Sequence, residues 1–93
     1  GGEKGAVAAH GYDDSMVVTG TLETLLRNSF PDASELAVED RTGGGDHFQV
    51  TVSSGRFDGL TLVDQHRLVY EALAGPLADG SIHELRIKTR GIA

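Results

Sequence analysis

Two stretches of sequence decide the fold of the second half of the chain: FDGLTLVDQHRLVY at residues 57–70 and IHEL at residues 82–85. The first joins a turn around Gly59 to a predicted helix from about Thr61 to Leu73, because apolar residues recur there at helical spacing. Thr61, with Asp64 three residues on, resembles a capping box. The second opens a predicted strand over residues 82–89, in which apolar and charged side chains alternate.

The predicted helix should bury one apolar stripe, and we interpret Tyr70 as a core residue with its hydroxyl at the edge. Gly75 and Pro76 should close or bend it, leaving residues 77–78 as a frayed turn. In the strand, Leu85 is expected to share a face with His83. The expected stripe consists of Leu62, Val63, His66, Val69, Tyr70 and Leu73.

His83 is the candidate with most chemical meaning, because it opens a strand in a chain that has no cysteine. A single histidine rarely fills the coordination sphere of a metal, so a partner would have to supply the other ligands. This pattern favours an adaptor over an enzyme. The alternative is a partly buried histidine that packs beside Leu85.

The first half of the chain predicts a helix and a hairpin. Leu22, Leu25, Leu26 and Phe30 recur at helical spacing, with a start near Thr19 or Gly20 and an end before Pro31. Alternating strands are expected over residues 35–39 and 48–53, joined by the flexible glycine turn 42–46. The expected fold class is therefore α+β: a three-stranded sheet with helices packed on one face.

Length and composition indicate one small domain over residues 18–93. Residues 1–17 are expected to be a disordered tail, either added for expression or left by processing. No apolar run reaches the length of a membrane helix, so we expect a soluble protein of the cytoplasm or, after removal of a transit peptide, of an organelle. The net charge of −6 lies in the first 46 residues, with nine acids against three bases, and disfavours nucleic acid as a partner.

Several short motifs occur in a specific order over roughly residues 20–89, among them Phe30-Pro31-Asp32-Ala33, His47-Phe48-Gln49-Val50, Gln65-His66-Arg67-Leu68-Val69-Tyr70 and Ile82-His83. Their order and spacing resemble the BolA family. The family fold is a class II KH-like αββααβ sandwich with a mixed sheet, in agreement with the elements above. The resemblance implies a monothiol glutaredoxin partner and a 2Fe–2S cluster shared with it, assisted by glutathione, in cluster delivery or iron signalling. The free chain should carry no cofactor and be a monomer or weak dimer.

The resemblance assigns the shared cluster ligand to His83 and makes His47, beside the glycine loop, a second candidate ligand. His47 is otherwise an exposed residue at a strand start. Arg67 is a candidate for contacting the partner or its glutathione, or else forms a surface salt bridge. Further candidates for partner contact are Arg86, Lys88, Gly43, Gly44 and Gly45.

Some bacterial BolA proteins are described as DNA-binding transcription regulators, which gives an alternative function. The candidate DNA contacts are then Arg67, Arg86, Lys88 and Arg90. The Gly-x-x-Gly loop with which KH domains usually grip RNA is missing, since the turn reads FDGL at residues 57–60. No catalytic constellation is apparent: Ser53 and Ser54 lack an evident base, and Asp58 and Asp64 read as solvated charges. We further interpret Asp46 as a turn residue and His66 as a hydrogen-bonded structural histidine.

Overall fold

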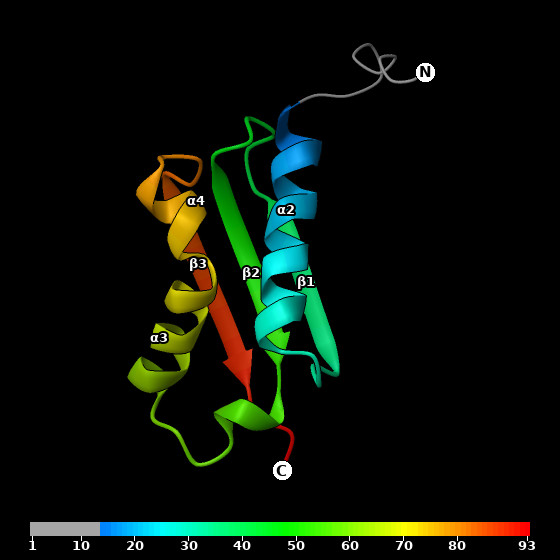
Figure 1. The fold of residues 1–93 in the computed structure, drawn as a ribbon, viewed down its shortest axis with the longest axis vertical. Helices are drawn as coiled ribbons and strands as arrows, with labels where there is room; N and C mark the ends of the chain where they lie inside the picture. The colour runs from blue at the N-terminus through cyan, green and yellow to red at the C-terminus, as the bar shows by residue number, and fades with distance from the viewer. Residues whose placement is uncertain (1–13) are drawn as a thin grey trace.

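The structure is a computed structural model that describes residues 14–93. Three strands form one mixed sheet in the order β1-β2-β3, and the helices cover one of its faces (Figure 1). This confirms the predicted α+β architecture. The elements are α2 (Asp14–Ser29), β1 (Glu35–Asp40), β2 (His47–Ser53), the 3-10 helix η1 (Gly55–Phe57), α3 (Leu62–Ala72), α4 (Ala74–Ala78) and β3 (Glu84–Arg90).

Helix α2 begins at Asp14, earlier than the predicted start near Thr19. It runs through Gly20, because one glycine costs a helix only about 1 kcal/mol and Val18 in the added turn packs against the core. Residues 14–17 of the predicted tail are therefore helical, and the rest of that tail lies outside the described residues. The helix ends at Ser29, before Pro31, as predicted.

Strands β1 and β2 form the predicted antiparallel hairpin, and β3 pairs with β2 in parallel. The pairing register places Glu39, Gln49 and Arg86 in one row across the sheet. Apolar residues alternate with polar ones along each strand, so one face meets the helices and the other is open. The buried core is made of Leu22, Leu26, Phe30, Phe48, Val50, Val52, Phe57, Val69, Leu73 and Ile82.

Helix α3 begins where predicted, and the Thr61 hydroxyl accepts a hydrogen bond from the Asp64 amide at 3.2 Å. The predicted stripe is only partly buried, since Val69 and Leu73 are in the core while Val63 is 67% exposed. Leu62 is also exposed, and the assignment of Tyr70 to the core is wrong, because its side chain is 47% exposed.

The geometry of the sheet explains this error. Helix α3 packs over β3, which is an edge strand, so the side of the helix beyond that edge has nothing to cover it. After α3, the segment expected as a frayed turn forms α4, with Pro76 buried. Strand β3 begins at Glu84 rather than at Ile82, although Ile82 is buried as part of the core.

Candidate functional site

His83 lies at the end of the sheet where the β1–β2 loop meets the start of β3 (Figure 1). Its side chain is 63% exposed, so the alternative of a partly buried histidine beside Leu85 is wrong. Its ring Nδ1 lies 3.1 Å from the Asp46 carboxylate. The backbone carbonyl of Asp46 also accepts hydrogen bonds from the amides of His83 at 2.8 Å and Glu84 at 3.2 Å.

Asp46 is therefore more than the turn residue that the sequence indicates. It is separated from His83 by 37 positions, and no local pattern links an aspartate in a glycine turn to a histidine before a later strand. The contact exists because β3 pairs in parallel with β2, which places the start of β3 beside the start of β2. Only the register between the two strands could have revealed it.

The glycine loop that precedes Asp46 is organised by one carboxylate. Asp40 accepts hydrogen bonds from the amides of Thr42 at 3.2 Å, Gly43 at 2.8 Å and Gly45 at 3.0 Å. Gly43 and Gly45 both have a φ of 79°, a conformation that other residues rarely adopt. The turn predicted to be flexible is thus bound internally through Asp40.

His47 is the first residue of β2, half-buried, and its register partner is Glu84 rather than His83. Within residues 14–93 no hydrogen bond or ion pair joins the two histidines, and no three potential metal-ligating side chains cluster together. The structure thus places both predicted ligands at the same end of the sheet without making them a complete metal site.

Two arginines border this end of the sheet. Glu84 is 3.3 Å from Arg41 and 3.5 Å from Arg86, so its charge is compensated beside His83. Arg41 was not identified from the sequence. It follows β1, and its backbone amide bonds to the carbonyl of His47, so pairing beyond the end of the strand brings it here.

The remaining cationic candidates do not gather on one surface. Arg67 lies on α3, 65% exposed and 3.5 Å from Asp64, which agrees with a surface salt bridge. Arg86, Lys88 and Arg90 are exposed at alternate positions of β3, on the open face of the sheet, as predicted. The sheet therefore separates these three residues from Arg67, which lies on the helical side.

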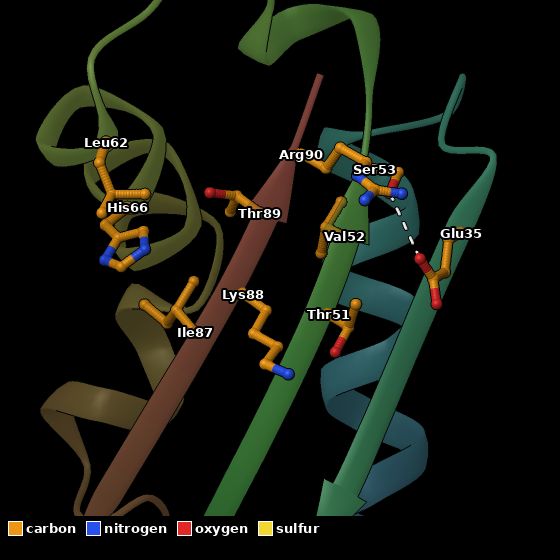
Figure 2. A pocket seen from close by; sticks show the side chains of 10 residues that line it. All are labelled: Glu35, Thr51, Val52, Ser53, Leu62, His66, Ile87, Lys88, Thr89 and Arg90. Carbon is orange, nitrogen blue, oxygen red and sulfur yellow. Dashed lines mark hydrogen bonds between the residues drawn. The ribbon is translucent and has the colours of Figure 1, made fainter. Parts of the chain in front are cut away.

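A hollow of about 570 Å³ lies at the other end of the sheet (Figure 2). It is bordered by Leu62 and His66 of α3 and by Ser53 and Arg90 at the ends of two strands. Neither candidate ligand lines it. His47 and His83 each lie four residues before the nearest lining residue of their strand, Thr51 or Ile87, which is about 13 Å at 3.3 Å per residue. His66 is half-buried, but within the described part of the chain its ring makes no hydrogen bond, unlike the interpretation from sequence.

Asp58 also differs from its interpretation as a solvated charge. Its carboxylate accepts hydrogen bonds from the amides of Ile92 at 2.7 Å and Ala93 at 3.1 Å, and so holds the segment after β3. Among the described residues, no helix is both long enough and apolar enough to cross a membrane.

Comparison with known proteins agrees with this architecture. Residues 25–92 match the model of the family described as BolA-like protein. The Rickettsia prowazekii protein RP812 is 38% identical over 71 residues, covering 76% of this chain and 90% of its own. The solved structure of BolA1 from Arabidopsis thaliana has a TM-score of 0.73 at 31% identity, covering 80% of this chain and 90% of that one.

A third relative carries a functional name. The DNA-binding transcriptional regulator BolA of Vibrio cholerae is 53% identical over 47 residues, which cover 50% of this chain and 43% of that protein. The match to the family model spans most of the described residues and includes both candidate ligands. The chain therefore belongs to the BolA-like protein family.

Proposed function

We propose that this BolA-like protein is a non-enzymatic adaptor that binds a monothiol glutaredoxin and shares a glutathione-assisted 2Fe–2S cluster with it, in iron–sulfur cluster delivery or iron signalling. The observation that carries the proposal is the exposed imidazole of His83, which has one ring nitrogen beside Asp46 and the other directed away from that contact. Such a side chain is accessible to a metal held by another protein.

The donor set of this chain fits a shared cluster and does not fit a resident one. A 2Fe–2S cluster takes four ligands, usually cysteine thiolates, and histidine can replace cysteine on one iron. This chain has no cysteine, and residues 14–93 contain no cluster of three potential ligands. His83 would supply one ligand, with His47 the candidate for another, and the partner and glutathione would supply the rest.

The surroundings of His83 support the approach of a partner protein. Arg41 and Arg86 both pair with Glu84 at this end of the sheet, so the charge of that carboxylate is compensated beside the exposed imidazole. Gly43 and Gly45 give the neighbouring loop a surface without side chains, which allows a partner backbone to approach closely.

The test is to mix the protein with a monothiol glutaredoxin, glutathione, iron and sulfide, and to record visible absorption and circular dichroism. We expect a spectrum distinct from that of the glutaredoxin alone. His83→Ala should alter or abolish it, whereas His66→Ala, at the opposite end of the sheet, should leave it unchanged. His47→Ala tests the second ligand in the same assay.

A mixture whose spectrum equals that of the glutaredoxin alone would contradict cluster sharing. Association without iron, together with no effect of His83→Ala on metal loading, would instead indicate a module that binds the apo partner only. Size-exclusion chromatography of the same mixtures with and without iron separates these two outcomes.

DNA binding is the second candidate, and two observations favour it. Arg86, Lys88 and Arg90 line one face of β3, and within residues 14–93 neither Lys88 nor Arg90 forms an ion pair. The similar Vibrio cholerae protein is named as a DNA-binding regulator. The net charge of −6 and the separation of Arg67 from this row count against it.

Fluorescence anisotropy with duplex DNA at increasing salt tests this second candidate. DNA binding would show a steep salt dependence, and the absence of binding at low salt would remove the candidate.

A further inference from the structure

Asp46 contacts His83 through both its backbone and its side chain. The backbone hydrogen bonds from His83 and Glu84 to the Asp46 carbonyl fix the loop against the start of β3. The side-chain contact of 3.1 Å joins the Asp46 carboxylate to the Nδ1 atom of the ring. Because these contacts use different atoms, removal of the carboxylate leaves the backbone attachment in place.

The chemistry of the two groups decides where the imidazole proton resides. An ionised carboxylate only accepts hydrogen bonds, so its contact with a neutral imidazole requires a proton on Nδ1. The lone pair is then on Nε2, the nitrogen through which a neutral histidine in this arrangement can bind a metal. Histidines that bind metals usually donate their other ring N–H to a carboxylate, a carbonyl or water.

The other nearby carboxylate does not compete for this role. Glu84 is adjacent to His83 in sequence, but its carboxylate is turned toward Arg41 at 3.3 Å and Arg86 at 3.5 Å. Among the described residues, Asp46 is the one carboxylate within hydrogen-bonding distance of the His83 ring.

We infer that Asp46 is a positioning residue that holds His83 with its proton on Nδ1 and so selects Nε2 as the nitrogen offered to the metal. The part that concerns the metal rests on the proposed function. The part that concerns the proton applies to the free protein and is tested without any cluster.

The first experiment is long-range ¹H–¹⁵N correlation NMR of the histidine rings in the free, full-length protein, at a pH above the histidine pKa. In the wild type, His83 should show a protonated Nδ1 and an unprotonated Nε2. Asp46→Ala should shift both nitrogens toward the opposite tautomer, and Asp46→Asn, which keeps an acceptor oxygen, should restore part of the wild-type pattern. The ring of His66, at the opposite end of the sheet, serves as the internal control and its signals should not move.

A wild-type His83 protonated on Nε2, or a His83 spectrum unaffected by Asp46→Ala, would overturn the inference. Unchanged backbone amide shifts away from the loop will show that the variant is folded. A purely structural role for Asp46 would change those amide shifts but not the tautomer.

The second experiment uses the mixed complex with histidine labelled with ¹⁵N at Nδ1 only or at Nε2 only. The reduced cluster should show hyperfine coupling to labelled Nε2 in the wild type, and Asp46→Ala should change this coupling. Coupling to Nδ1 would overturn the inference and leave the proposed function intact. If no shared cluster forms on the wild type, the proposed function fails, and with it the role of Asp46 toward a metal, whatever tautomer the free protein shows.

Discussion

The Ser54 hydroxyl donates a hydrogen bond of 2.8 Å to the Asp32 carboxylate and so joins the turn after α2 to the start of η1. The same carboxylate accepts a bond of 2.8 Å from the Gly55 amide, and Ser54 is fully buried. Arg56, one residue further on, donates to the carbonyl of Ser29 at 2.7 Å and lies over the ring of Phe30. This network fixes the end of the molecule opposite to His83.

The Asp32 network should make stability depend on pH. The Ser54 hydroxyl, followed by the Gly55 amide, lowers the pKa of Asp32 below its usual 3.8. A lowered pKa in the folded state contributes stability above the unfolded value, and this stability is lost as the pH falls through the folded value. We therefore expect Asp32→Asn to reduce the free energy of unfolding at pH 7, and the difference from wild type to shrink below pH 4. Urea denaturation across pH 2–7 measures this.

The matched control for that experiment is Asp64→Asn. Its carboxylate pairs only with the exposed Arg67 at 3.5 Å among the ion pairs of the described residues. Exposed pairs contribute little, about 0–1 kcal/mol. If the difference in free energy of unfolding between the wild type and Asp32→Asn stayed constant down to pH 2, the proposed contribution of Asp32 to the pH dependence of stability would be refuted.

The glycine loop should lose its order without Asp40. Asp40→Ala removes the acceptor of three backbone amides, so the amides of Gly43 and Gly45 should exchange with solvent faster. Asp40→Asn keeps one acceptor oxygen and should give an intermediate effect. The expected cost is about 1–3 kcal/mol for the opening of the loop, measured by amide hydrogen exchange. Unchanged protection at both glycines would show that the carboxylate does not hold the loop.

Two positions of the predicted stripe on α3 should respond very differently to truncation. Leu73→Ala removes a fully buried side chain and should reduce the free energy of unfolding by about 2–5 kcal/mol. Val63→Ala, at a position that is 67% exposed, should change it by less than about 0.5 kcal/mol. Equal costs in chemical denaturation would mean that α3 is rotated relative to the orientation described above.

The hydrogen bonds from Ile92 and Ala93 to Asp58 predict that substitutions at Asp58 and Gly91 are energetically coupled. A Cβ atom on Gly91 would overlap the Asp58 carboxylate, so Gly91→Ala should displace the carboxylate and break its bonds to the amides of Ile92 and Ala93. Asp58→Ala should cost about 1 kcal/mol by removing the same bonds. The double variant should lose less free energy of unfolding than the sum of the two single variants, because the steric overlap and the hydrogen bonds involve the same carboxylate. Additive costs in a double-mutant cycle would disprove the coupling.

Much of the fold could be predicted from local pattern. Alternation over residues 35–39 and 48–53 identified both strands of the hairpin, and the glycine-rich turn between them indicated their antiparallel pairing. Thr61 identified the start of α3, because a threonine cap satisfies amides only three residues away. The start of α2 was missed, since Gly20 suggested a boundary while burial of Val18 carried the helix through it.

The candidate site, like the fold, was predictable only where it depends on neighbouring residues. The sequence by itself determined that His83 stands alone before a strand in a chain without cysteine, and that Arg86, Lys88 and Arg90 share a strand face, because these are properties of neighbouring residues. Only the tertiary structure decided that Asp46 meets the Nδ1 atom of His83 and that Tyr70 lies outside the core. Both depend on how β3 pairs beside β2 and forms the edge of the sheet. Periodicity within one segment shows which side chains share a face, but it does not show which distant strand the segment pairs with or in which direction.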